Sequence, residues 1–166
     1  MKNVRIRPFL LTIAVVAFAA CGGGDQPEPS DSAPATTGGD ELTAFQLEHG
    51  IGPITDVVEL GEPDHELAEQ GEQLFALKCT ACHKLGERYI GPPLGTVLDR
   101  RSPAYVMNMM LNPTEMTQRH PDAKALLAEY LAPMPNQDLS QQDARAVLEY
   151  LRLAEAEEVE GEDGND

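Results

Sequence analysis

Near the middle of the chain, two cysteines stand three positions apart and a histidine follows the second one directly. These residues are Cys79, Cys82 and His83. At this spacing two thiols can reach the two vinyl groups of one haem, and the adjacent imidazole can reach its iron. The C-x-x-C-H pattern therefore predicts one covalently attached haem c, with His83 as an iron ligand.

A C-x-x-C pair is also typical of zinc sites and of redox-active thiol pairs. A zinc site needs further Cys or His ligands that come together in the fold. Outside the motif the histidines are His49, His65 and His120, and they are scattered along the chain. This distribution favours haem attachment over zinc binding.

The opposite side of the iron needs a second ligand, and five methionines follow the motif. Three of them fall inside a predicted helix, where a row of methionines is more typical of core packing. Met116 is expected in a polar loop. Met134 lies between Pro133 and Pro135, in a short connection whose rigidity would aim the thioether inward. We therefore predict Met134 as the sixth ligand. The alternatives are Met110, Met116 and His120.

Two protein ligands on the iron would leave no coordination position for oxygen, peroxide or a substrate. His/Met ligation also stabilises ferrous iron and raises the reduction potential. Elsewhere the chain has no pattern typical of a nucleophile with its base, a phosphate-binding glycine loop or paired catalytic carboxylates. The sequence thus favours an electron carrier over an enzyme. The competing hypothesis is a haem enzyme or gas sensor whose Met ligand is displaceable.

The segment from residue 66 to 153 has helical periodicity throughout and no alternating β pattern. Ser102 followed by Pro103 is a typical helix start, and Ser140 with Asp143 three residues later is close to a capping box. Four helices are expected, over residues 67–79, 103–112 and 121–132 and from residue 140 onward.

With the haem motif in this helical setting, residues 66–153 resemble the class I cytochromes c, small all-α electron carriers. Gly71 and Phe75 match the family's N-terminal helix. The run Gly91-Pro92-Pro93-Leu94 matches its G-P-x-L motif. The residues that match its C-terminal helix are Val147, Tyr150 and Leu151.

The resemblance implies a cytochrome c fold, with about four helices around one haem and the terminal helices crossing at Gly71. It also implies that the carbonyl of Pro92 holds the far nitrogen of His83, and that Leu94 packs on the haem. Tyr89 and Tyr105 are candidates for a hydrogen bond to a haem propionate. In the family's pattern, Met134 occupies the place of the sixth ligand.

The first 21 residues have the features of an export signal: Lys2, Arg5 and Arg7, then an apolar run, then Phe18-Ala19-Ala20-Cys21. This ending resembles the lipobox of bacterial lipoproteins. Because haem uses two of the three cysteines, lipidation would also account for Cys21. We expect a lipid anchor at Cys21 on the periplasmic side of a bacterial membrane. The alternative is an ordinary secretory signal that is cleaved near Ala20.

The formal charge of -16 belongs mostly to the ends of the chain. Residues 22–65 hold ten acids and no Lys or Arg, and residues 154–166 hold seven acids and no base. The chain lacks the basic stripe that a nucleic-acid partner would require. We expect a flexible acidic tether over 22–65, the cytochrome c domain over 66–153, and a disordered acidic tail over 154–166.

Residues 41–65 carry apolar side chains that the rest of the tether lacks. They could form an extended wrap over the domain or a segment that binds a partner, and the sequence slightly favours stable association with a larger complex. The expected partners are redox proteins: a quinol-oxidising complex as donor, and a terminal oxidase or another reductase as acceptor.

Overall fold

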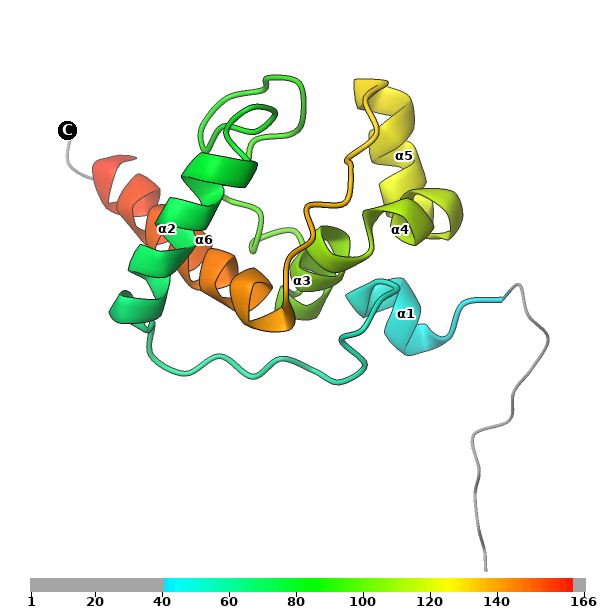
Figure 1. Ribbon diagram of the computed structural model, residues 1–166, viewed down its shortest axis with the longest axis horizontal. Helices are drawn as coiled ribbons and strands as arrows, with labels where there is room; N and C mark the ends of the chain where they lie inside the picture. The colour runs from blue at the N-terminus through cyan, green and yellow to red at the C-terminus, as the bar shows by residue number, and fades with distance from the viewer. Residues whose placement is uncertain (1–40, 163–166) are drawn as a thin grey trace, which may run out of the picture. The chain divides into compact units, whose positions relative to one another are not determined.

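The computed structural model describes residues 41–162, with side chains as far as Ala154. The predicted signal peptide, Cys21 and residues 22–40 lie outside the described residues. Within residues 41–162 there are six α-helices and no strand (Figure 1). The all-α prediction is therefore confirmed, with two helices beyond the expected four. The helices are α1 (Ala44–His49), α2 (His65–Lys78), α3 (Pro103–Leu111), α4 (Pro113–Arg119), α5 (Pro121–Tyr130) and α6 (Gln141–Glu162).

The predicted helix starts are present in the structure. The hydroxyl of Ser102 accepts a hydrogen bond from the backbone N–H of Tyr105, and Pro103 is the first residue of α3. Before α6, the N–H of Ser140 donates to the carboxylate of Asp143, and the N–H of Asp143 donates to the Ser140 hydroxyl. This reciprocal pair is a capping box, which satisfies backbone groups that the helix leaves unpaired.

In the part of the chain that the structure describes, no helix is long and apolar enough to cross a membrane.

Helices α2 and α6 cross each other and form the main packing interface of the fold (Figure 1). A Cβ atom on Gly71 would overlap the carbonyl of Ala146, so the close approach of the two helices requires glycine. Beside this crossing the rings of Phe75 and Tyr150 lie 5.2 Å apart, centroid to centroid. The crossing at Gly71 that the family resemblance implies is therefore present. The fully buried α6 residues here include Val147, Leu148 and Leu151.

Helix α4 follows α3 directly, where the sequence predicts a polar loop. Pro113 occupies its first turn, because proline ends one helix and is well suited to begin the next. Met116 is completely buried, and its sulfur accepts a hydrogen bond from the N–H of Ile51 at 3.0 Å. The expectation that Met116 lies in a loop is wrong, because this short helix turns its one large apolar side chain inward.

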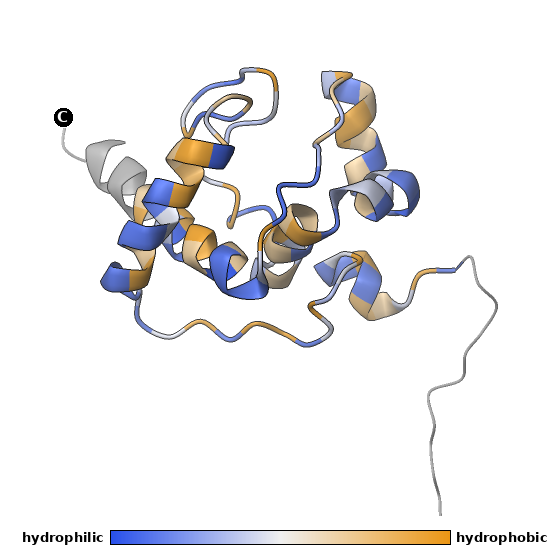
Figure 2. Cartoon of the chain, in the orientation of Figure 1, coloured by the Kyte–Doolittle hydropathy of each residue, from blue (hydrophilic) through white to orange (hydrophobic). Residues whose placement is uncertain are grey.

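Residues 41–64 lie against the helical domain. Ile51 is buried in a second apolar cluster with Tyr105, Met116 and Ala123. Figure 2 shows hydrophobic residues at intervals along the extended segment between α1 and α2. Of these, Ile54, Val58 and Leu60 pack on the main core. The structure therefore shows the wrap that was one of the two alternatives for residues 41–65, and it differs here from the flexible tether predicted over 22–65.

The amide of Asn108, on α3, holds part of this segment in place. Its oxygen accepts from the N–H of Ile54, and its nitrogen donates to the carbonyls of His49 and Ile54, each at 3.0 Å. The side chain is completely buried. Because a buried amide is unfavourable without partners, the segment and Asn108 stabilise each other.

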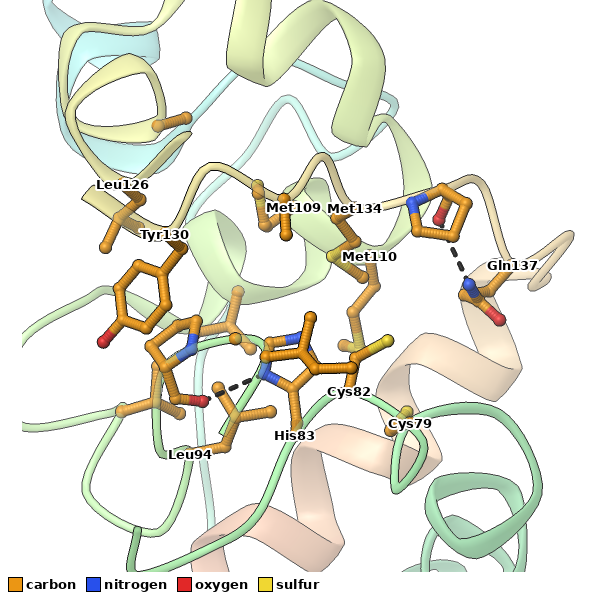
Figure 3. Close-up of a pocket in the computed structure, with 18 of the residues that line it drawn as sticks. Cys79, Cys82, His83, Leu94, Met109, Met110, Leu126, Tyr130, Met134 and Gln137 are labelled. Carbon is orange, nitrogen blue, oxygen red and sulfur yellow. Dashed lines mark hydrogen bonds between the residues drawn. The ribbon is translucent and has the colours of Figure 1, made fainter. Parts of the chain in front are cut away.

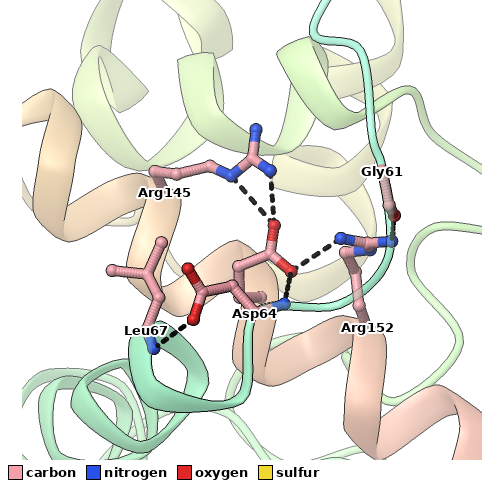
Figure 4. Close-up of polar contacts among 6 residues, drawn as sticks. Gly61, Asp64, Leu67, Arg145 and Arg152 are labelled. Atoms are coloured by element: carbon pink, nitrogen blue, oxygen red, sulfur yellow. Dashed lines mark hydrogen bonds and ion pairs between the residues drawn. The ribbon is translucent and has the colours of Figure 1, made fainter.

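A buried carboxylate holds the other end of the segment to α6 (Figure 4). Glu149 is fully inaccessible, and it accepts hydrogen bonds from Arg145, Arg152 and the N–H of Asp64. Arg152 also donates to the carbonyl of Gly61 at 2.6 Å. A charge at this depth requires such partners, because removal from water is costly. Residues 61–64 are thus attached to the C-terminal helix before α2 begins.

The backbone of α6 continues to Glu162. The sequence predicts a disordered tail over 154–166, so the helix extends into the predicted tail. Residues 154–162 are rich in Ala and Glu, which have high helix propensity, and this composition allows the helix to continue past the core.

Candidate functional site

The two motif cysteines, His83, Pro92, Leu94 and the predicted sixth ligand line one cavity (Figure 3). Its walls come from the end of α2 and the loop after it, from α3 and α5, and from the connection between α5 and α6. Most of the lining side chains are apolar. The predicted residues in the lining are Cys79, Cys82, His83, Pro92, Leu94 and Met134.

His83 is held in one orientation by the loop that follows it. Its Nδ1 lies 2.9 Å from the carbonyl oxygen of Pro92, which is the contact that the resemblance implies. A carbonyl can only accept, so Nδ1 carries the hydrogen and Nε2 keeps its lone pair. The imidazole is therefore oriented as a metal ligand.

The glycine of the G-P-x-L run leaves room for this imidazole. A Cβ on Gly91 would overlap the ring of His83. The N–H of Gly91 donates to the carbonyl of Cys82 at 2.8 Å, and the N–H of Leu94 donates to the carbonyl of Lys84 at 3.0 Å. These bonds fold the loop back on the haem-binding motif. Gly91 leaves room for the imidazole and Pro92 supplies the carbonyl that it contacts, so the two residues stand side by side.

Cys79 and Cys82 are both free thiols on this wall. Cys79 caps the C-terminal end of α2, and the N–H groups of Cys82 and His83 both donate to its carbonyl. Burial raises the pKa of the Cys79 thiol to about 11, against a smaller opposing effect of Lys78. The thiol is therefore protonated at neutral pH.

The structure reduces the candidates for the sixth ligand. Met116 lies outside the cavity with its sulfur on Ile51. His120 also lies outside, and both its ring nitrogens are engaged: Nδ1 accepts from the N–H of Asp122, and Nε2 donates to the carbonyl of Leu47. The methionines that line the cavity are Met109, Met110 and Met134.

Met134 differs from the other two cavity methionines in where it is attached. It belongs to the connection between α5 and α6 and is half-buried, whereas Met110 is a buried core residue of α3. In Figure 3 both sulfurs lie on the side of the cavity that faces His83. The choice of Met134 over Met110 remains a prediction.

One buried polar atom indicates what else the cavity holds. The hydroxyl of Tyr105 is buried and has no hydrogen-bond partner among the described residues, and Tyr105 lines the cavity. Burial raises the pKa of this hydroxyl. The guanidinium of Arg101 also lines the cavity, 4.9 Å from the Tyr105 ring. An anionic acceptor such as a haem propionate would satisfy the hydroxyl, so these residues fit a haem. Tyr89 is 54% exposed and lies outside the lining.

Some polar residues of the cavity are not among those predicted from the sequence. They include Lys78, the last residue of α2, and Gln137, three residues after Met134. The ammonium of Lys78 donates to the backbone carbonyl of Gln137 at 2.9 Å. The two residues are 59 positions apart, so no local pattern could have revealed the contact.

Within residues 41–162, no group of three or more His, Cys, Asp or Glu side chains gathers as a zinc site would need.

Comparisons with known proteins agree with this geometry. Cytochrome c from Rhodothermus marinus is 53% identical with a TM-score of 0.64, and the match covers 68% of this chain and 97% of that one. An engineered form of that protein, bound to a carbene intermediate, is 54% identical with a TM-score of 0.61 over 67% of this chain and 96% of that one. No curated protein sequence matches the chain. The model of the cytochrome c family matches residues 68–154, which is more than half of the chain. The chain therefore belongs to the cytochrome c family, whose members bind haem c covalently and carry electrons.

Proposed function

We propose that this cytochrome c is a lipid-anchored electron carrier of a bacterial respiratory chain. It takes single electrons from a quinol-oxidising complex and passes them to a terminal oxidase or another reductase. The proposal includes the two axial ligands, His83 and Met134, and an anchor at Cys21. One observation carries it: His83, both motif cysteines and Met134 line the same apolar cavity.

Each wall of the cavity has a role in this function. Cys79 and Cys82 would hold the haem covalently, and Pro92 keeps the proton on Nδ1 of His83 so that Nε2 is free for the iron. When bound, haem c supplies an iron that gains or loses one electron. The apolar side chains exclude water from the site, and a low-polarity environment favours the ferrous state and a high reduction potential.

The axial assignment is supported by the exclusion of its competitors. Met116 and His120 lie outside the cavity and are engaged in other contacts. With Met134 as a second ligand, the iron has no free position for a substrate, which favours electron transfer over catalysis. The competing hypothesis of an enzyme or gas sensor requires that Met134 leave the iron easily.

The function is tested on the purified holoprotein by potentiometric titration and by electron exchange with membranes of the source organism. We expect a single one-electron transition at positive potential, fast reduction by a quinol-oxidising complex and fast oxidation by an oxidase. The ferric protein should show the far-red absorption band that a methionine sulfur gives to haem. A low potential, no exchange and rapid carbon monoxide binding would together favour the enzyme or sensor.

The anchor is tested separately. Cys21→Ser removes the thiol that would carry the lipid. Because stable anchoring needs several acyl chains, the variant should move from the membrane fraction to the soluble periplasmic fraction. High-salt washing of the wild-type membranes serves as a control, since it removes proteins held only by charge. Recovery of Cys21→Ser in the membrane fraction would contradict lipidation at this position.

A further inference from the structure

The segment that carries Met134 packs on the core through Met134 and Leu139 but has few hydrogen bonds to other elements. It begins at Leu131, which ends α5 with a left-handed φ of 54° and is 83% exposed. Its side-chain hydrogen bonds are local: the amide of Gln137 donates to the carbonyl of Pro135, and the N–H of Asp138 donates to Asn136. Such bonds shape the segment without attaching it to the rest of the fold.

Lys78 supplies an attachment to another element. Its Nζ donates to the backbone carbonyl of Gln137 at 2.9 Å. In the part of the chain that the structure describes, this is the one hydrogen bond between residues 132–139 and a different helix or loop. Lys78 directly precedes Cys79, so the bond joins the helix that carries the haem-binding motif to the segment that carries Met134.

The cavity and Asp143 direct the ammonium of Lys78 toward the carbonyl of Gln137. The side chain lines the cavity and is half-buried, so it does not extend freely into water. It also lies near Asp143, whose pKa is lowered by hydrogen bonds from Ser140 and, to a smaller degree, by the charge of Lys78. A charged ammonium donor makes the bond to the Gln137 carbonyl stronger than a neutral donor would.

We propose that Lys78 is a positioning residue that holds the Met134 segment against the cavity and so limits the dissociation of Met134 from the iron. The inference rests on the proposed ligation by Met134. Loss of the ammonium would free the segment at a point three residues from the ligand. Met134 would then leave the iron more often, and an external ligand would bind faster.

The test uses ferric holoprotein and measures the rate at which imidazole replaces the methionine. Lys78→Met keeps the apolar stem but removes the donor, and we expect the rate to rise about five- to tenfold, as for the loss of one hydrogen bond of ordinary strength. Lys78→Arg retains a charged donor and should stay within about twofold of the wild-type rate.

Lys84→Met is the matched control. Lys84 lies on the other side of the motif and also donates to a backbone carbonyl, that of Thr80, but this contact stays within its own turn. The variant removes the same charge at a similar place and should leave the imidazole rate unchanged. An equal acceleration in both variants would assign the effect to charge and overturn the proposal.

The remaining outcomes separate this inference from the ligand assignment. If the wild-type far-red band is present and lost in Met134→Ala, yet Lys78→Met binds imidazole at the wild-type rate, Lys78 has no positioning role. If the wild-type band is absent, both the ligation by Met134 and the role of Lys78 are wrong. Thermal unfolding of the ferrous variants checks that Lys78→Met is folded.

Discussion

The two walls of the haem cavity are built in different ways. The wall that carries His83 is a loop tied to itself by short-range bonds: Nδ1 of His83 to Pro92, and the N–H groups of Gly91 and Leu94 to carbonyls near the motif. The wall that carries Met134 is an extended connection, and among the described residues it has one hydrogen bond to another element, the bond from Lys78. One ligand is therefore positioned by its own neighbours in sequence, whereas the other depends on packing between distant elements.

This difference indicates where the site is rigid and where it can open. Short-range bonds close small loops at little entropic cost, so the His83 wall can form early and stay formed. The Met134 wall gains its position only when α2, α5 and α6 are assembled. We therefore expect substitutions in the Met134 wall to remove the methionine ligand. Substitutions in the His83 wall should instead strain the fold and reduce its stability.

The largest expected effect is that of Met134→Ala on the Met134 wall. The far-red band of the ferric protein should disappear completely, and the reduction potential should fall because the sulfur ligand favours ferrous iron. Absorption spectra and potentiometric titration measure both. Met110→Leu, which conserves volume, is the control and should keep the band. If the band survives in Met134→Ala and disappears in Met110→Leu, the ligand is Met110.

On the His83 wall, Gly91→Ala should reduce stability. Its Cβ would overlap the imidazole of His83, and we expect a loss of about 3 kcal/mol in the free energy of unfolding, the upper range for overpacking. Chemical denaturation of the holoprotein measures it. Gly61→Ala is the matched control, because nothing lies within 4 Å of its added Cβ. Equal stability of the two variants would show that the His83 wall is not tightly packed.

Asn108→Ala tests a region outside both walls. It leaves the N–H of Ile54 and the carbonyls of His49 and Ile54 without their partner, so we expect a loss of about 2 kcal/mol in unfolding free energy. The haem spectrum and potential should be unchanged. A weakened far-red band in this variant would show that residues 41–64 help to hold the Met134 wall.

The smallest effect is expected for Asp143→Asn, at the end of the Met134 wall. Hydrogen bonds from Ser140, with a smaller contribution from Lys78, lower the pKa of Asp143 from its usual 3.8. Because the folded-state pKa is below the unfolded one, the stabilisation is present above about pH 3.8 and disappears as the pH falls through the folded-state value. The variant should lose less than about 1 kcal/mol at neutral pH, as is typical of an acid at a helix start.

Urea unfolding of the wild type and of Asp143→Asn at a series of pH values measures this difference. The two proteins should converge in acid, since the wild-type carboxyl is then neutral as well. A difference that stays constant with pH would mean that the charge of Asp143 contributes nothing to stability.

The elements that could be predicted from the sequence are those held by interactions between residues close together in the chain. Four of the helices were predictable because their caps and apolar stripes are local, as for Ser102 with Pro103 and Ser140 with Asp143. Helices α1 and α4 were missed because six or seven residues are too few to show a periodic pattern. For residues 41–65 the sequence left a wrap over the domain and a partner-binding segment as alternatives, because Asn108 and Glu149 hold this segment from distant positions.

By itself, the sequence determined the half of the site that carries the cysteines and His83. The spacing of Cys79, Cys82 and His83 specifies haem attachment, and Gly91 and Pro92 specify how the imidazole is held, because each of these contacts spans ten residues or fewer. Only the tertiary structure decided which methionines line the cavity and that Lys78 reaches the Met134 segment. The contact of Lys78 with Gln137 joins residues 59 positions apart, and such contacts arise from the packing of helices, which no local pattern encodes.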